Sequence, residues 1–518
     1  MPSFGGFQVV LTADRTLMAG YQLLFDGMVA ASQTTTTPIP LLGRFLMPRP
    51  GLEPSNNGHP PVRAAVAPLG LRRIEAALVE GGFDPESVAV VDQDHLRDAI
   101  GPDTRAIGVS SGEPLGQGMN TTTMTAIAGG TIYPAEMFRR LMRDVSRLRR
   151  ERAPRAKVIA GGPGAWQLAS DPAVRGKIGV DHVITGYAEG NAAAVFRAIV
   201  DGESLPDVIA GERVPAEAIP RIRGASTMGV VEISRGCGLG CSFCTIGRVP
   251  MLHLPEDAVA ADVAANVANG QRNAALLSED FFRYGAAGAK ANPPAVLRLL
   301  RRVRAIDGVR LLQIDHANVL SIAQFSDGDL QAARELLAGL PAARLRQAGR
   351  EPLRYPWVNV GVETASPRLL RENGGAAKMG TFGDSWPDAC AREVLRLCRV
   401  GFFPLVSLLV GLPGETDDDV RATLAWVRSI AGERLSVFPM LHAPITDAGP
   451  AVRLNALHWR LIRECYRLNF RWIPRLYWDN QSNGGVGLPR RCVTQVLARG
   501  QMLEWRTLFA LRAMGAAR

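Results

Sequence analysis

Short apolar runs and longer amphipathic stretches alternate along the first half of the chain. The apolar runs predict strands and fall at residues 64–67, 87–92, 107–111, 157–160 and 182–185. The stretches at 71–80, 134–152 and 188–200 have the apolar period of helices. Strands that alternate with helices through short loops are typical of a parallel sheet with helices on both faces. This part of the chain is therefore predicted to be a doubly wound, Rossmann-like domain.

A second series of the same kind begins near residue 229. Its predicted strands fall at residues 229–234, 274–278, 309–314, 357–362 and 405–410, with helices between them. This arrangement predicts a β/α barrel or partial barrel, in which chemistry lies at the carboxyl ends of the strands. From residue 436 the alternation stops, and 454–476 and 489–514 read as helices. Trp459, Trp472, Tyr477 and Trp478 in this tail are candidates either for closing a substrate site or for core packing.

The predicted fold class is therefore α/β with several domains, as a chain of 518 residues requires. The predicted boundaries are an extension over 1–61 with one strand at 7–12, the Rossmann-like domain over 62–205, a linker over 206–225, the partial barrel over 226–435 and a helical region over 436–518.

Composition points to a cytoplasmic protein. The seven cysteines do not pair in the pattern of a secreted protein, which favours a reducing compartment. The start of the chain lacks the features of a signal peptide, and no apolar run approaches the ~18 residues that span a membrane. The net charge of +10 permits a nucleic-acid partner. However, the arginines are interleaved with apolar positions on helices, which is typical of solvated helix faces and makes nucleic acid a poor candidate.

Three successive strands of the first domain end in glycine-rich turns. Because the carboxyl ends of parallel strands share one edge of the sheet, ligands of such sheets bind there. Glycines allow the backbone to approach a flat or bulky ligand closely, although tight turns in an empty domain would need them too. The candidate binding residues are Ser110, Ser111 and Gly112 after the first of these strands, Gly161, Gly162 and Pro163 after the second, and Gly186, Tyr187 and Glu189 after the third.

Three cysteines follow the first barrel strand with the spacing Cys-x-x-x-Cys-x-x-Cys. They are Cys237, Cys241 and Cys244, and no fourth cysteine follows nearby. Electron-transfer [4Fe–4S] clusters use four thiolates, so three thiolates leave one iron open. An open metal position indicates chemistry rather than a structural site. The loop therefore predicts an enzyme, against the alternatives of a structural metal or free thiols.

The cysteine loop, with Phe243 before its last cysteine, resembles that of the radical S-adenosylmethionine (SAM) enzymes. The resemblance implies a [4Fe–4S] cluster on Cys237, Cys241 and Cys244 whose open iron chelates SAM. It extends to later strand ends, which implies that SAM is contacted by Phe243, Ser278, Glu279, Asp280, Glu363, Ser366 and Val410. No residue is assigned to the chemical step.

A doubly wound domain ahead of such a barrel resembles the cobalamin-dependent class of these enzymes. The resemblance covers roughly residues 62–435 and implies that the glycine-rich turns hold cobalamin. Many cobalamin domains offer a histidine through an Asp-x-His-x-x-Gly motif, and Asp92-Gln-Asp94-His95 does not match that spacing. His95 is therefore predicted to be a surface histidine rather than a cobalt ligand.

The implied activity is a methyltransferase that uses SAM, the cluster and methylcobalamin to methylate a carbon of a natural-product, peptide or protein substrate. A flavodoxin- or ferredoxin-type electron donor is implied as a partner. The main alternative is a non-methylating radical enzyme that performs dehydration, epimerisation or rearrangement. A methylthiotransferase would carry three further cysteines upstream, and the printed sequence has none before Cys237. An iron–sulfur sensor is the non-enzymatic alternative.

Overall fold

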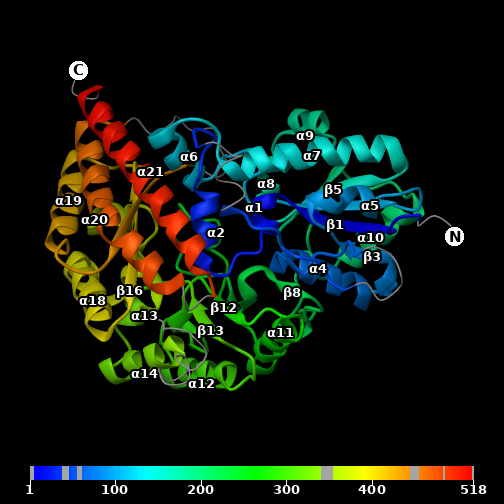
Figure 1. The fold of residues 1–518 in the computed structure, drawn as a ribbon. Helices are drawn as coiled ribbons and strands as arrows, with labels where there is room; N and C mark the ends of the chain where they lie inside the picture. Colours follow the sequence, from blue (N-terminus) through cyan, green and yellow to red (C-terminus); the bar gives the residue numbers. More distant parts are fainter. Residues whose placement is uncertain are drawn as a thin grey trace. The chain divides into compact units, whose positions relative to one another are not determined.

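The computed structural model describes residues 5–37, 46–54, 61–339, 354–443, 454–481 and 485–515, so parts of the predicted extension over 1–61 lie outside it. The chain forms two compact units (Figure 1). Unit 1 comprises Met1–Gln117, Gly129–Val230 and Ala261–Gln271, and unit 2 comprises Gly118–Ala128, Val231–Ala260 and Arg272–Arg518. No helix within the described ranges is long and apolar enough to cross a bilayer.

Unit 1 is built on a six-stranded sheet in which every neighbouring pair is parallel. The strand order is β3-β1-β4-β5-β6-β7. The strands are β1 (Val9–Ala13), β3 (Val88–Val90), β4 (Ala106–Ser110), β5 (Lys157–Gly161), β6 (His182–Thr185) and β7 (Val208–Ala210). This confirms the predicted parallel α/β sheet.

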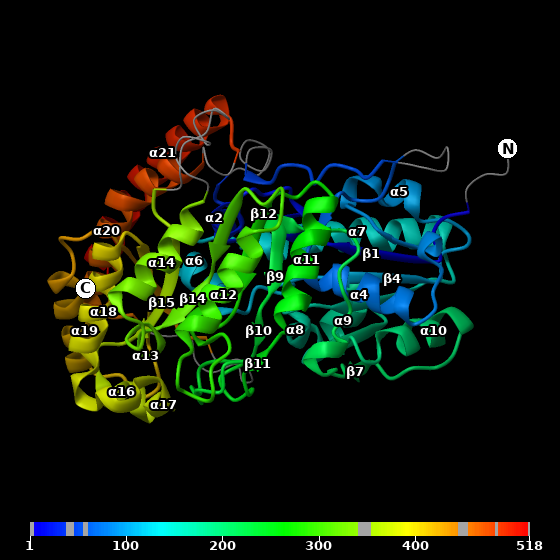
Figure 2. The same cartoon turned by 90° about the horizontal axis from the view of Figure 1, so that it is seen from below.

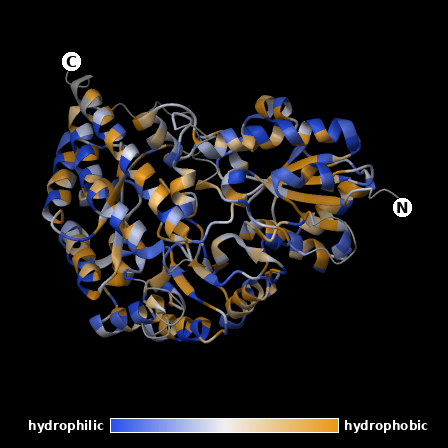
Figure 3. Ribbon diagram, viewed as in Figure 1, coloured by the Kyte–Doolittle hydropathy of each residue, from blue (hydrophilic) through white to orange (hydrophobic). Residues whose placement is uncertain are grey.

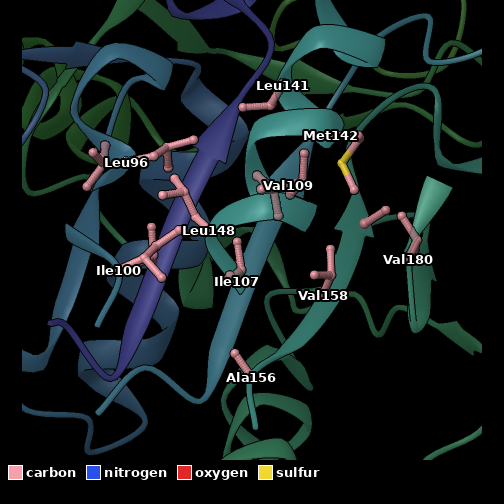
Figure 4. Close-up of a cluster of buried hydrophobic side chains, with 14 of the residues drawn as sticks. Leu96, Ile100, Ile107, Val109, Leu141, Met142, Leu148, Ala156, Val158 and Val180 are labelled. Carbon is pink, nitrogen blue, oxygen red and sulfur yellow. The ribbon is translucent and has the colours of Figure 1, made fainter. Parts of the chain in front are cut away.

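Helices cover both faces of this sheet because successive strand side chains point to opposite faces. The helices of unit 1 are α1 (Arg15–Met18), α2 (Leu24–Ala31), α4 (Leu69–Glu80), α5 (Leu96–Ala99), α7 (Tyr133–Arg152), α8 (Ala165–Ala169), α9 (Pro172–Ile178) and α10 (Ala192–Asp201). Val10 joins the core beneath α7 (Figure 4), whereas Val9 and Leu11 join a second core beneath α4 and α10. In Figure 3 the strands are accordingly apolar, and α7 is polar over much of its length.

Two predicted boundaries of this domain differ from the structure. The strand that we expected in an N-terminal extension is β1, and it is an interior strand of the sheet, second from the edge, between β3 and β4. More than 70 residues separate β1 from β3, the next strand of this sheet along the chain. The strand–helix alternation of the domain is therefore not visible at β1. The predicted linker over 206–225 contains the edge strand β7, whose three residues are too short and too exposed to form an apolar run. The predicted strand at 64–67 appears as β2 (Val66–Ala67), which pairs with β8 (Ala225–Ser226) outside the main sheet.

Unit 2 contains the partial barrel. Three strands run in the order β9 (Val230–Glu232), β12 (Asn273–Leu277), β13 (Leu311–Ile314), and four more in the order β14 (His316–Asn318), β15 (Trp357–Glu363), β16 (Phe403–Val410), β17 (Ser436–Leu441). Asp315 alone separates β13 from β14, so the two sheets follow one strand path (Figure 2). Two short strands, β10 (Ser234–Arg235) and β11 (Leu252–His253), pair at the base of the cysteine loop.

The helices of unit 2 connect and extend this path. They are α6 (Met119–Ala128), α11 (Glu256–Ala268, shared with unit 1), α12 (Pro293–Arg304), α13 (Val319–Ile322), α14 (Asp327–Ala338), α16 (Pro367–Glu372), α17 (Ala376–Met379), α18 (Trp386–Val400), α19 (Asp417–Ser429), α20 (Ala456–Gln481) and α21 (Leu488–Gly515). The predicted tail helices are thus confirmed as α20 and α21.

The predicted end of the barrel at residue 435 falls one strand short. β17 pairs in parallel with β16 over six positions. Its sequence contains Pro439, which argues against a central strand because proline cannot donate a ladder hydrogen bond. β17 lies at the edge of the sheet, where proline is tolerated. The helix α6, which the sequence pattern did not predict, belongs to this unit, and Thr123 Oγ1 accepts the backbone N–H of Leu441 at 2.8 Å.

Most of the tail aromatics serve packing. Trp459 is buried on α20, and its ring lies 6.5 Å from that of Phe509 on α21. Tyr466 of α20 contacts the same phenylalanine at 4.9 Å between centroids. Arg491 stacks over Trp478 at 4.3 Å. Each of these contacts joins α20 to α21, so these aromatic side chains pack the two tail helices together.

Candidate active site

The loop that carries the three cysteines is shaped by glycine. Gly236, Gly238 and Gly240 have φ values of 76°, 71° and 83°, a region that side chains disfavour. A methyl group on Gly236 would lie 2.4 Å from the carbonyl oxygen of Pro250, so a side chain cannot be accommodated there. The backbone N–H of Cys237 donates to the carbonyl of Val249 at 3.0 Å and closes the loop. The glycines before and between the cysteines thus set the path of the loop.

The three thiols lie in a sheltered place beside two cations. Cys241 is buried, and Cys237 and Cys244 are half-buried. Burial raises the pKa of the Cys241 thiol to about 11, an effect opposed by the charge of Lys378. Arg283 donates to the carbonyl of Cys237 at 2.8 Å, and its charge also opposes the raised pKa of that thiol. Nearby cations stabilise thiolates, the form that binds iron.

The thiols are not arranged around a single point. Within the described ranges, no group of three or more His, Cys, Asp or Glu side chains is placed to hold one metal ion. Thiolates that hold a [4Fe–4S] cluster bind different irons, so they need not converge. The donor chemistry of the loop, with soft thiolate ligands alone, fits iron and sulfide.

Polar residues follow β12 at the carboxyl end of the barrel. The Ser278 and Ser234 hydroxyls lie 2.6 Å apart, and the backbone N–H of Asp280 donates to Ser278 Oγ at 3.1 Å. Asp280 is fully buried, and its Oδ1 accepts the Ser321 hydroxyl at 2.7 Å and the backbone N–H of Asn318 at 3.2 Å. Its Oδ2 is buried with no hydrogen-bond partner in the structure. A buried carboxylate oxygen of this kind has capacity to bind a cationic or N–H group of a ligand.

Glu363 forms a second buried feature at the end of β15. Its φ of 67° is uncommon for a residue with a side chain and coincides with a bulge between Gly361 and Glu363. Lys378 Nζ donates to Glu363 Oε1 at 2.6 Å, and both side chains are buried. A methyl group on Gly361 would lie 2.6 Å from Lys378 Nζ, so the glycine makes room for this ion pair. Lys378, in α17, carried no sequence signal and was missed.

A hydrogen-bonded relay lies where β13 passes into β14, and it too was missed. Asn359 donates to Asp315 Oδ1 at 2.8 Å, and His316 Nδ1 lies 3.1 Å from Asp315 Oδ2. Partial burial opposes a charged imidazole, but Asp315, Glu279 and Glu363 together raise the pKa of His316 to about 9. The ring is therefore an imidazolium at neutral pH, close to predicted SAM residues. The available signal was Asp315-His316 directly after a barrel strand.

The other predicted SAM residues have mixed surroundings. Glu279 is exposed next to buried Asp280, and Phe243 is buried within the cysteine loop. Val410 is buried at the end of β16. Ser366 caps α16, since it accepts the backbone N–H of Leu369 at 3.2 Å and donates to Asp419. Its hydroxyl is thus occupied by structural hydrogen bonds.

The predicted glycine-rich edge of unit 1 is present. β4, β5 and β6 are neighbours, so their carboxyl ends lie together. A methyl group on Gly112 or Gly186 would meet nothing within 4 Å, and one on Gly161 only a carbonyl at 3.9 Å. A methyl group on Gly162 would instead lie 2.4 Å from Ser110 Oγ, so this glycine lets two turns pack together. The edge therefore combines tight turns with open backbone.

The remaining predicted cobalamin residues and His95 differ in their exposure and contacts. The ring of Tyr187 is covered by Arg213 at 5.3 Å. Pro163 is exposed, and Glu189 is partly buried. His95 Nδ1 lies 2.6 Å from Asp92 Oδ1, and the side chain is 27% exposed. That contact joins His95 to its own 3-10 turn, in agreement with the expected surface histidine.

Asp14, at the end of β1, was not singled out in the sequence. It is fully buried, and its Oδ2 accepts the Ser111 hydroxyl at 2.9 Å. Its Oδ1 accepts the backbone N–H of Thr16 at 3.0 Å and also the Thr16 hydroxyl. Burial raises the pKa of Asp14 to about 6, even though these hydrogen bonds lower it. Asp14 thus links the predicted cobalamin residue Ser111 to the end of β1.

Replacing Asp14 with asparagine should change how stability depends on pH. The folded pKa of about 6 exceeds the model-peptide value near 3.9, so the folded state holds its proton more tightly. The associated stability is present below pH ~4 and is lost as pH rises through ~6, roughly 3 kcal/mol in all. Urea unfolding at pH 5 and pH 8 measures this effect. The free energy of unfolding of Asp14→Asn, relative to that of wild type, should be higher at pH 8 than at pH 5. Thr16→Val removes a hydrogen bond to the Asp14 carboxylate, so it should lose more stability than wild type as pH rises. Equal pH dependence of the free energy of unfolding in all three proteins would contradict the raised pKa of Asp14.

The site and the fold together define a class of protein. A partial β/α barrel has a three-cysteine loop after its first strand and buried acids at its carboxyl edge, which is the architecture of a cluster-dependent enzyme. Residues 231–427 match the Radical SAM superfamily, so the chain contains a radical SAM domain over its barrel. This confirms the expected enzyme class.

Two sequence relatives are named for methylthio chemistry on different molecules. The ribosomal protein uS12 methylthiotransferase RimO of Anaeromyxobacter sp. (strain Fw109-5) is 28% identical over 308 residues, 56% of this chain and 59% of RimO. A tRNA-2-methylthio-N(6)-dimethylallyladenosine synthase of Sorangium cellulosum is 27% identical over 328 residues, 59% and 60% of the two chains. The chain thus spans about three fifths of the length of these relatives.

A solved structure shares the fold over most of the chain. The radical SAM methyltransferase TsrM of Kitasatospora setae, solved with cobalamin and a [4Fe–4S] cluster, matches with a TM-score of 0.51 and 16% identity. The match covers 85% of this chain and 74% of TsrM. A second TsrM structure, with tryptophan and a SAM analogue, matches with a TM-score of 0.52. The chain therefore shares the fold of TsrM over most of its length, which agrees with the predicted fold class.

Proposed function

We propose that this chain is a cobalamin-dependent radical SAM methyltransferase that methylates a carbon of a small-molecule or peptide substrate. The observation that carries the proposal is the open glycine edge of unit 1 in a chain whose barrel is a radical SAM domain. A radical SAM barrel alone requires no such domain. TsrM, which shares the fold, binds cobalamin.

Different residues of the barrel would bind the cluster and SAM. Cys237, Cys241 and Cys244 would hold the cluster, and Lys378 and Arg283 would offset its negative charge. Asp280, with its unpartnered Oδ2, and the neighbouring Glu279 would face the SAM amine. Charge-assisted hydrogen bonds of this kind are stronger than neutral ones. Glu363, held by Lys378, and Val410 would contact the rest of SAM.

The edge of unit 1 would cradle the corrin. Gly112, Gly161 and Gly186 leave backbone exposed to a flat ligand, and Ser110, Ser111, Gly162, Pro163, Tyr187 and Glu189 would form its border. His95 is not assigned to cobalt, because the Asp92–His95 segment lacks the Asp-x-His-x-x-Gly spacing. When bound, these cofactors supply one-electron chemistry and methyl-group transfer, and the protein orients them.

The sequence relatives favour a second candidate, methylthio transfer to a ribosomal protein or a tRNA. Methylthiotransferases were expected to carry a second cluster on upstream cysteines, and the printed sequence has no cysteine before Cys237. The two candidates differ in the product, because methylation adds one methylene unit of mass and methylthiolation also adds a sulfur atom. Mass spectrometry of the product separates them.

Filling the open edge should abolish cobalamin binding without harming the cluster. The double variant Gly112→Leu/Gly161→Leu places side chains where a methyl group meets little or nothing, so the fold should be retained. After anaerobic reconstitution with cobalamin, iron and sulfide, we expect bound corrinoid to fall at least about tenfold, equivalent to ~1.4 kcal/mol. Iron content should be unchanged.

Gly176→Leu is the matched control. This exposed glycine of α9 also has nothing within 4 Å of its would-be methyl group, but it lies away from the strand ends. Corrinoid content should equal that of wild type. Wild-type protein that binds no corrinoid, while producing deoxyadenosine from SAM, would instead favour the non-methylating alternative.

A further inference from the structure

Large exposed apolar side chains are concentrated on one helix. The described residues contain six of them, and four belong to α21: Leu488, Val496, Leu503 and Leu511, with exposures of 59%, 71%, 69% and 56%. Single exposed apolar residues are ordinary, but a cluster of them marks an interaction surface. The remaining two, Val208 and Leu252, lie on separate strands.

These side chains share one face of α21. Leu488, Cys492, Val496, Gly500, Leu503, Thr507 and Leu511 are spaced by three or four residues, which places them along one side of a helix, and all are exposed. We call this stripe the outer face of α21, the helix labelled in Figure 1. On the inner side Thr494 and Phe509 are buried, and Phe509 packs against Trp459 and Tyr466 of α20. The inner side therefore anchors the helix and leaves the outer face free.

Charge borders the outer face asymmetrically. Arg499 and Arg506 are exposed, seven residues apart, and lie along one border of the stripe. Glu504 lies along the other border. Arg506 is additionally held over the ring of Phe470 at 5.6 Å. A second copy of this chain, paired antiparallel along the stripe, would bring these arginines together, and the net charge of +10 adds to the repulsion.

We propose that the outer face of α21 docks an amphipathic helix of a partner protein whose apolar stripe is flanked by carboxylates spaced seven residues apart. An apolar helix face recognised by another helix is a common mode of association, and flanking charges select the partner and its orientation. The surface is independent of the methyl-transfer proposal, because it uses none of the residues assigned to cofactors.

A designed peptide tests the surface directly. One probe is a helical peptide with leucines on a heptad stripe and glutamates on its flanks, and the other has lysines in place of the glutamates. With reconstituted full-length protein, fluorescence anisotropy should show that the glutamate peptide binds at least about tenfold more tightly, or ~1.4 kcal/mol. The bound peptide should also slow alkylation of Cys492, the exposed cysteine in the stripe, as followed by peptide mapping.

Two variants and one control make the test specific. Val496→Glu/Leu503→Glu should weaken binding of the glutamate peptide by about tenfold or more. Surface changes of this kind leave the fold intact, so the loss would report on the interface. Arg499→Glu/Arg506→Glu should reverse the preference towards the lysine peptide. Val208→Glu, at an exposed apolar site on β7 outside the outer face of α21, should bind the peptides like wild type.

Three results would overturn the proposal. Equal binding of the two peptides, or no protection of Cys492, would show that the charges select nothing. Light scattering that finds a dimer, dissolved by Leu503→Glu, would assign the face to a second copy. Sedimentation with vesicles of anionic phospholipid, lost in the same variant, would assign it to a membrane surface.

Discussion

Cys241→Ala should lose its iron–sulfur cluster and, with it, all measurable cleavage of SAM. Cys241 is the buried member of the three thiols, so solvent has poor access to replace its sulfur. Loss of a residue that merely supports a metal ligand costs roughly 10–100-fold in affinity or activity, and loss of a ligand should exceed that. Iron and sulfide per chain after anaerobic reconstitution, and SAM consumption with reductant, give the two readouts.

The matched control is Cys465→Ala. Cys465 is equally buried, on α20, and takes no part in the cysteine loop. It should keep wild-type iron content and activity. If Cys241→Ala retained the same iron and the same spectrum as this control, the cluster would have to be held elsewhere, and the assignment of the loop would be wrong.

Asp262→Leu should lower the free energy of unfolding of unit 1 by about 3–5 kcal/mol, the usual effect of stripping one partner from a buried ion pair. Asp262 is fully buried, and its two carboxylate oxygens both accept from Arg73, which is 2% exposed. Asp262 Oδ1 also accepts the backbone N–H of Ile222 at 3.1 Å. The leucine would leave a buried guanidinium and a buried amide without this acceptor. Urea unfolding, followed by the helical signal, measures the loss.

The double variant Asp262→Leu/Arg73→Met separates charge from packing. Replacing both partners by apolar groups of similar size is often close to neutral, so most of the loss should be regained. Recovery should stay incomplete, because Arg73 also donates to the carbonyl of Pro220. A double variant as unstable as the single one would show that the packing of Asp262, rather than the charge of Arg73, sets the effect.

Features with a regular local pattern could be predicted from the sequence. The strands β4, β5 and β6 are buried apolar runs followed by glycine, and both their direction and their shared edge follow from the alternation. The cysteine loop was recognisable because its three predicted ligands lie within eight residues of the sequence. By contrast, β1 and β17 were misassigned because a long excursion or an internal proline breaks the pattern on which assignment depends.

Partners supplied by distant segments could not be predicted. Lys378 reaches Glu363 from a four-residue helix, and nothing in that helix distinguishes a buried lysine from a solvated one. Asn359 aligns Asp315 only because β14 and β15 pair at that register. Ser366, predicted to contact SAM, also caps a helix, a role that the sequence pattern did not reveal. Tertiary register, rather than residue type, decides these roles.

The helix α6 also bears on the synthesis of this protein. Its Thr123 accepts a hydrogen bond from a residue 318 positions later in the chain. At translation rates of about 5–20 residues per second, roughly 15–60 s pass between the emergence of the two segments. During that interval α6 is on the nascent chain without β17 and α21, the elements it packs against in the finished protein. Co-translational folding of unit 1 must therefore proceed around an unsatisfied helix, and heterologous expression should benefit from chaperones that shield it until the last strand leaves the ribosome.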